Sequence, residues 1–191
     1  MTTKNRWINA KCLTNDPNFI FEQGIQRLHN LHLTVPGSHI SAKAVLWAGL
    51  LSGVVVLVLE MILAPLVMNM GPWVPARMPA AITMGTVMLP PPETFDLSVV
   101  LPSAIIHFAL SLVYALGFAF IAKGRSMRAD ALLGAGLGLL LYVINFYGFT
   151  SLFPWFAEMR HWATAFGQVV YGAVLGATYA YFAKRRPRPA A

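Results

Sequence analysis

Charged residues are scarce in this sequence. Only 11% of its 191 residues are Asp, Glu, Lys or Arg, whereas soluble domains carry about 25%. A single cysteine, Cys12, excludes a framework of internal disulfides. Basic residues outnumber acidic ones by 14 to 7, but long stretches have no charge, unlike the basic surface of a nucleic-acid-binding protein. We therefore expect neither an ordinary soluble domain nor a nucleic-acid partner.

Apolar residues make up 57% of the chain and gather in runs long enough to cross a bilayer as helices, which takes about 20 residues. The predicted spans are residues 44–68, 97–122, 131–153 and 162–183. A proline-rich loop, residues 69–96, separates the first two, because its prolines cannot lie inside a helix. The predicted fold is all-α: a polytopic membrane protein whose transmembrane domain, residues 43–183, is a four-helix bundle.

The basic residues fall mostly on one side of these spans. Twelve of the 14 lie before the first span, between the second and third, or after the fourth, and only Arg77 and Arg160 lie on the other side. The positive-inside rule then predicts a multi-pass protein of the bacterial cytoplasmic (inner) membrane with both termini in the cytoplasm. We expect the basic tail, residues 184–191, to contact anionic lipid headgroups. Residues 1–42 form a cytoplasmic segment, with an interfacial amphipathic helix expected over 16–32.

Small and polar residues recur at matching offsets in the predicted spans. The matched sets are Gly49, Gly53 and Glu60 in the first span and Gly134, Gly138 and Asn145 in the third, all 85 residues apart. At an offset of 61, His107 in the second span matches Gln168 in the fourth. Two interpretations fit this spacing: a duplicated two-helix hairpin, or chance similarity among apolar, glycine-rich helices.

Each predicted span carries one strongly polar side chain in the outer half of the bilayer. They are Glu60, His107, Asn145 and Gln168. Small residues mark the places where transmembrane helices pack closely, so polar residues on the same faces should point into the bundle. The predicted helix-packing residues are Gly49, Gly53, Gly134, Gly138, Gly172 and Gly176. The four polar residues are therefore predicted to form one buried cluster.

A carboxyl group inside a membrane is costly, which makes Glu60 a candidate functional residue. We expect it to stay protonated or to pair with His107. Such a pair suits a proton-coupled carrier, and it could also bind a metal, although two ligands make an incomplete site. Alternatively, the polar residues only link the helices by hydrogen bonds. No nucleophile, phosphate loop or cysteine motif is found, so we predict no catalytic residue, no metal site and no cofactor.

Three stretches resemble a known group of proteins. They are LEMILAPLVMNMGPWVPARMPAAITMG, VMLPPPETFDL and YVINFYGFTSLFPWFAEMRHW. They are similar to an uncharacterised family of small bacterial inner-membrane proteins with four predicted helices, over about residues 44–183. Some members carry the label sodium:proline symporter. We set that label aside because such symporters resemble inverted-repeat bundles with many more helices. The resemblance implies a fold and assigns no functional residues.

Three functions are open from the sequence. The first is an accessory component of a membrane assembly that binds a protein partner or a second copy of itself through an aromatic external face. This face would comprise Phe149, Phe153, Trp155, Phe156 and Trp162. The second is a small oligomeric proton-coupled carrier or channel that uses Glu60 and His107. The third is a metal- or haem-binding membrane protein. Enzymatic activity has the least support.

Overall fold

The computed structural model describes residues 34–35, 38–89, 94–122 and 126–184. The chain divides into two compact units, Met1–His39 and Ile40–Ala191. In the first unit, β1 (Thr34–Val35) pairs antiparallel with β2 (Ser38–His39). The helix expected over residues 16–32 lies outside the described residues, as does the tail beyond residue 184. The candidate site belongs to the second unit, which is described by itself below.

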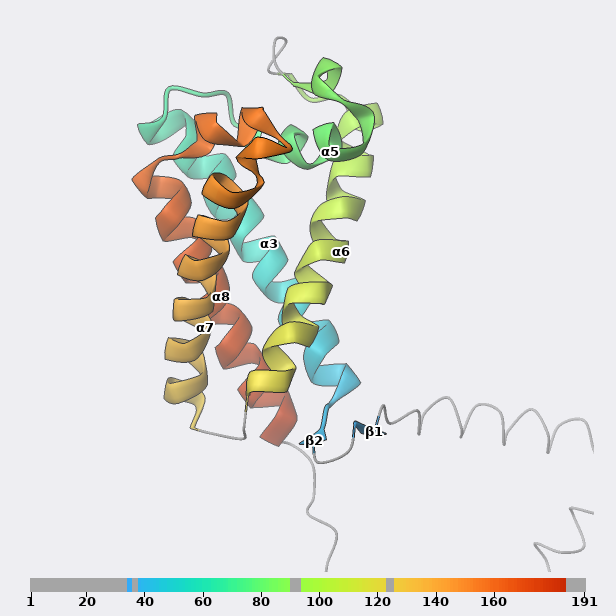
Figure 1. The fold of residues 1–191 in the computed structure, drawn as a ribbon, viewed down its shortest axis with the longest axis vertical. Helices are drawn as coiled ribbons and strands as arrows, with labels where there is room; N and C mark the ends of the chain where they lie inside the picture. The colour runs from blue at the N-terminus through green and yellow to red at the C-terminus, as the bar shows by residue number, and fades with distance from the viewer. Residues whose placement is uncertain (1–33, 36–37, 90–93, 123–125, 185–191) are drawn as a thin grey trace, which may run out of the picture. The chain divides into compact units, whose positions relative to one another are not determined.

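Long helices dominate the second unit (Figure 1). They are α3 (Ala42–Val67), α6 (Leu97–Ile121), α7 (Met127–Val143) and α8 (Trp162–Lys184). The first three begin where an oxygen-bearing side chain accepts a hydrogen bond from a backbone N–H of the first turn. These capping residues are Ser41, Asp96 and Ser126. The all-α prediction is confirmed for this unit.

Three of these segments are long and apolar enough to cross a membrane: Ala42–Val67, Leu97–Ile121 and Met127–Ser151. They mark the chain as a membrane protein by length and composition. The fourth predicted span forms the 23-residue helix α8, but α8 does not reach the same level of hydropathy within the described residues. It is rich in Gly, Ala, Thr and Tyr. The four-span prediction is therefore confirmed for three helices, and the crossing by α8 stays a prediction.

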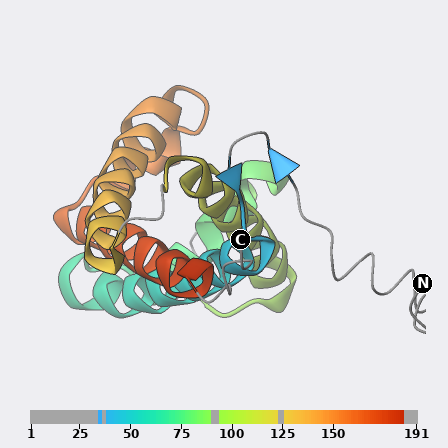
Figure 2. The same cartoon turned by 90° about the horizontal axis from the view of Figure 1, so that it is seen from below.

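The helices pack in an order different from their order in the chain. Helix α7 lies along α8, α8 along α3, and α3 along α6. Seen from below, α7, α8, α3 and α6 follow one another in this order along a curve (Figure 2). Most described side chains of α8 are buried or half-buried, and only Trp162, Phe166 and Tyr181 among them are exposed. Small residues allow neighbouring helices to approach this closely.

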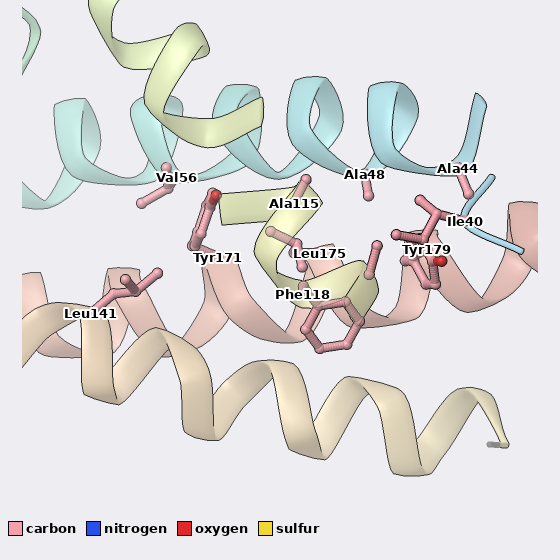
Figure 3. Close-up of a cluster of buried hydrophobic side chains, with 11 residues drawn as sticks. Ile40, Ala44, Ala48, Val56, Ala115, Phe118, Leu141, Tyr171, Leu175 and Tyr179 are labelled. Carbon is pink, nitrogen blue, oxygen red and sulfur yellow. The ribbon is translucent and has the colours of Figure 1, made fainter. Parts of the chain in front are cut away.

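The larger of two apolar clusters, the apolar core, lies mostly in the half of the unit where α3 begins and α8 ends (Figure 3). Ala44 and Ala48 on α3 are fully buried and let the neighbouring helices approach closely. Phe118 on α6 and Leu175 on α8 are also fully buried. The Phe118 ring lies edge-on to Tyr179, with 5.8 Å between the ring centroids. This part of the unit is filled by side chains.

The predicted helix-packing glycines all lie at contacts between helices. Gly49 and Gly53 on α3 face Leu112 and Phe108 on α6. The other four lie where α7 meets α8, and a Cβ added to any of them would collide with a carbonyl oxygen of the opposite helix. They are Gly134, Gly138, Gly172 and Gly176. The backbones of α7 and α8 are therefore in direct contact, as in glycine-mediated membrane helix pairs.

The two antiparallel pairs, α3 with α6 and α7 with α8, have the same register. In the first pair, His107 Nε2 lies 3.0 Å from the carbonyl oxygen of Gly53. In the second pair the matching residues also meet, because a Cβ on Gly138 would collide with the carbonyl oxygen of Gln168. A duplicated hairpin predicts this agreement, and so does close antiparallel packing through glycines. The duplication stays a prediction.

The proline-rich connection between α3 and α6 contains short helices. They are α4 (Val74–Arg77), η1 (Met78–Ala80), α5 (Ala81–Met84) and η2 (Thr86–Met88). Arg77 is only 4% exposed. Its Nε donates to the carbonyl of Met88 at 3.2 Å, and its Nη1 donates to the carbonyl of Thr94 at 2.8 Å. This guanidinium therefore fastens the connection together.

The third predicted span, residues 131–153, differs from the observed helix at both ends. Helix α7 begins at Met127, after the Ser126 cap, and its α-helical part ends at Val143. A π-helical turn, η3 (Ile144–Gly148), and a 3₁₀ turn, η4 (Phe149–Ser151), follow it. The sequence boundary was set by hydropathy, which does not detect a polar cap or a change of helix type. A further 3₁₀ helix, η5 (Pro154–Met159), leads to α8.

Candidate functional site

A partly open cavity of about 300 Å³ lies among α3, α6 and α8, beside the short helices of the connections between α3 and α6 and between α7 and α8. All four residues of the predicted polar cluster line it: Glu60, His107, Asn145 and Gln168. Three further polar side chains join them, namely Ser111, Tyr114 and Tyr171. The structure thus brings together polar residues from three long helices and from the π-helical turn after α7.

The Glu60 carboxyl group contacts α8. The side chain of Gln168 forms a hydrogen bond with it. Gly167 of α8 lies beside this side chain, because a Cβ at that position would be in ordinary van der Waals contact with it, 3.5 Å from Glu60 Cγ and 3.6 Å from Glu60 Oε1. Glu60 is half-buried and lines the cavity. Gln168, the residue matched to His107 in the sequence, is therefore the direct partner of Glu60.

His107 is held by the backbone of α3. Its Nε2 lies 3.0 Å from the carbonyl oxygen of Gly53. A carbonyl oxygen can only accept, so this contact requires the hydrogen on Nε2 and leaves Nδ1 able to take up a proton. The imidazole also meets the edge of the Phe108 ring, with 5.1 Å between centroids. No ion pair joins His107 to Glu60 in the described part of the chain, so their expected pairing is replaced by bonds to Gly53 and Gln168.

Two hydroxyl groups of α6 connect this helix to its neighbours around the cavity. The Tyr114 hydroxyl donates to Asn145 Oδ1 at 3.3 Å, across to the π-helical turn η3. The Ser111 hydroxyl donates to the carbonyl of Gly49 at 2.7 Å and lies 3.1 Å from the Tyr171 hydroxyl. Sequence analysis did not select Tyr171. Its position one helical turn after Gln168, on the same face of α8, was the available signal.

Aromatic and methionine side chains form the outer wall of the cavity. They are Phe146, Phe149, Phe153, Phe156, Met78 and Met159. Three residues of the predicted external aromatic face thus line the cavity. Trp155 packs on Phe156, with 6.1 Å between ring centroids, and Trp162, 62% exposed, remains outside. Much of the surface predicted for a partner is therefore part of the cavity wall.

The inner end of the cavity meets the apolar core. Val56 and Tyr171 belong both to the cavity lining and to the core of Figure 3. Beyond them, toward the start of α3, lie the buried side chains of Ala48, Ala115 and Leu175. The cavity is consequently closed on this side by packed side chains.

One acidic residue was missed by sequence analysis. The earlier start of α7 brings Asp130 into its first turn, where it is only 2% exposed. The backbone of Asp130 packs directly against Gly176 of α8. Asp130 is thus more deeply buried than Glu60, although it does not line the cavity. The predicted span began at residue 131, one position after Asp130, so Asp130 was not counted among the residues of the span.

Of the described His, Cys, Asp and Glu residues, Glu60 and His107 alone line the cavity. In the part of the chain that the structure describes, no group of three or more such residues is placed to hold a metal ion.

Comparisons with family profiles, curated proteins and solved structures found no match to this chain.

Proposed function

We propose that this membrane protein binds a small molecule in the cavity and acts as a small carrier, with Glu60 and His107 at the polar end of the site. The observation that carries the proposal is that polar side chains from separate helices face one cavity of about 300 Å³. That volume is at the lower end of the range for small-molecule sites, about 300–1,000 Å³.

The alternative of a purely structural cluster fits the geometry less well. Side chains that only link helices would be packed against one another, with the space between them filled. Here Asn145 and Ser111 are bound to neighbours, yet both still face the cavity. The lining also has the composition of a ligand site, mostly apolar and aromatic with a few polar groups placed to orient a ligand.

The proposal includes a membrane topology. Helix α8 crosses the bilayer as the fourth span, shielded from lipid by α3 and α7, and both termini lie in the cytoplasm. Lys43 and Arg128, both exposed, stand near the ends of α3 and α7 that would face the cytoplasm. The cavity then lies in the outer half of the bilayer, with the apolar core closing it toward the cytoplasm.

A pair of adjacent substitutions on α6 tests the binding role. Ile106 lines the cavity, whereas its neighbour Ile105 is 63% exposed on the outer surface of the helix. Ile106→Trp should fill part of the cavity, and Ile105→Trp adds the same bulk outside it. After mild extraction and purification, mass spectrometry should find a small molecule with the wild type and with Ile105→Trp, and much less of it with Ile106→Trp.

Equal recovery of small molecules from all three proteins would contradict the proposal. A protein that copurifies at fixed stoichiometry with all three, without any small molecule, would instead support the accessory function.

A further inference from the structure

Resting on the proposed function, we propose that the cavity takes a hydrophobic organic cation, an amine or quaternary ammonium with an aromatic or aliphatic body, and exchanges it for one proton at Glu60.

The charges around the cavity favour a cation. Among the residues that the structure describes, Glu60 is the only acid in the lining, and no Lys or Arg lines the cavity. The two arginines of the outer connections are bound elsewhere: Arg77 to the carbonyls of Met88 and Thr94, and Arg160 to the carbonyl of Phe146 and the hydroxyl of Thr150. An anionic ligand would thus meet a carboxyl group without a compensating guanidinium or ammonium group. A cationic ligand would meet its counter-charge.

The wall of the cavity suits the rest of such a ligand. Aromatic rings attract cations through their negative faces, and this attraction strengthens when water is excluded. Phe146 and Phe156 lie side by side in the wall, with 5.7 Å between ring centroids, and Phe153 lies at the same distance from Phe156. Met78 and Met159 add flexible apolar surface that adapts to ligands of different shape. A hydrophobic body therefore fits against the wall while the cationic group lies near Glu60.

The exchange follows from the cost of an uncompensated charge. An ionised carboxyl in an apolar surrounding is expensive without a cation beside it. The empty site therefore holds a proton on Glu60. When the ligand cation binds, the O–H bond of Glu60 breaks, the proton leaves to water and the carboxylate stays beside the cation. One positive charge enters for each one that leaves.

Other groups that face Glu60 must be separated from this effect. His107 and Tyr114 face it from α6, Gln168 and Tyr171 from α8, and Asn145 from η3. Of these, only His107 gains a positive charge near neutral pH, and a protonated His107 would repel the ligand. Loss of a proton from either Glu60 or His107 favours the ligand cation, so tighter binding of the cation at higher pH is expected from both residues. The two residues must therefore be substituted one at a time.

Calorimetric titration of the purified full-length protein with two probes tests the inference. Benzyltrimethylammonium is permanently charged, and neopentylbenzene is a neutral molecule of nearly the same shape. The cation should bind the wild type at least about tenfold more tightly than the neutral probe, as expected for a desolvated cation site. Titrations in buffers of different ionisation enthalpy should show release of about one proton per cation bound, as the exchange at Glu60 requires.

Matched variants assign the effect to Glu60. Glu60→Gln should bind the cation at least about tenfold more weakly and release no proton, because Gln has the shape of the protonated acid without its charge. Its unchanged binding of the neutral probe would show that the cavity is intact. His107→Gln should still release the proton. Glu158→Gln, an exposed position outside the cavity lining, should behave as the wild type.

Equal affinity for the two probes, or proton release that persists in Glu60→Gln, would overturn the cation exchange and leave the proposed binding function standing. If neither probe binds, the copurification experiment decides. A small molecule lost only in Ile106→Trp would mean that the ligand class is wrong, and no such molecule would mean that the binding function fails too.

Discussion

At the scale of residues, both arginines on the predicted outer side serve the local structure. Arg77 holds the connection between α3 and α6. The Nε of Arg160 donates to the carbonyl of Phe146 at 2.7 Å, and its guanidinium lies 4.6 Å from the centroid of the Tyr147 ring. Arginine donates in several directions at once, which allows one side chain to satisfy carbonyls at helix ends. The two exceptions to the charge asymmetry thus have a structural explanation.

Asp96 offers a test at the same scale. The hydroxyl and then the amide of Ser98 donate to its carboxylate and hold the pKa of Asp96 below its ordinary value. The stability gained is complete above the ordinary aspartate pKa of about 3.9 and is lost as the pH falls through the lowered pKa. Asp96→Asn keeps a capping oxygen. When the pH is lowered from about 5 to about 3, the thermal unfolding temperature of Asp96→Asn in detergent should therefore fall less than that of the wild type. A parallel fall in both proteins would contradict this role.

At the scale of elements, Asn145 belongs to the π-helical turn that follows α7. An α-helix turns about 100° per residue, and the π-helical turn η3 begins at the residue before Asn145. Asn145 lies within hydrogen-bonding distance of Tyr114 there. Interruptions of this type often occur at functional sites. The same chain segment is also fixed by Arg160, so its geometry depends on residues from both ends of the connection.

The glycine contacts of α7 and α8 can be tested with two glycines on one helix. A Cβ at Gly138 would collide with the carbonyl oxygen of Gln168, whereas a Cβ at Gly136 would meet nothing within 4 Å. Gly138→Ala should force the helices apart and lower the free energy of unfolding by about 3 kcal/mol, as overpacking does. Gly136→Ala should be neutral or stabilise by up to about 1 kcal/mol. Unfolding of both variants in mixed detergent micelles measures the difference, and equal effects would refute direct backbone contact.

At the scale of the whole helical unit, the small residues of α8 match its burial, because only Trp162, Phe166 and Tyr181 among its described side chains are exposed. A helix that faces lipid needs a continuous apolar surface, whereas a helix between two others needs small residues for close approach. Buried positions of α8 include Gly167, Gly172 and Gly176, each close to a neighbouring helix. The hydropathy of α8 alone therefore does not identify it as a span, and its crossing stays a prediction.

The proposed topology predicts which positions are accessible from each side of the membrane. In a Cys12→Ser background, Val87→Cys, at a position 72% exposed in η2, should react with a membrane-impermeant maleimide in spheroplasts. Met127→Cys, at a position 43% exposed where α7 begins, should react only after permeabilisation. A reporter fused to the C-terminus should also be protected. If Met127→Cys reacts in spheroplasts and Val87→Cys reacts only after permeabilisation, the orientation is the opposite of the one proposed. If the cysteines react as predicted but the C-terminal reporter is accessible from outside, α8 does not cross the membrane.

The sequence by itself determined the class of the protein, the three apolar helices and four of the polar residues that line the cavity. Hydropathy and helical periodicity are properties of a single segment, so both can be read before folding. Only the tertiary structure decided which helices are neighbours, that Glu60 meets Gln168 and His107 meets Gly53, and that aromatic residues expected outside form the cavity wall. Contacts between distant segments depend on how the helices pack, which no local pattern contains.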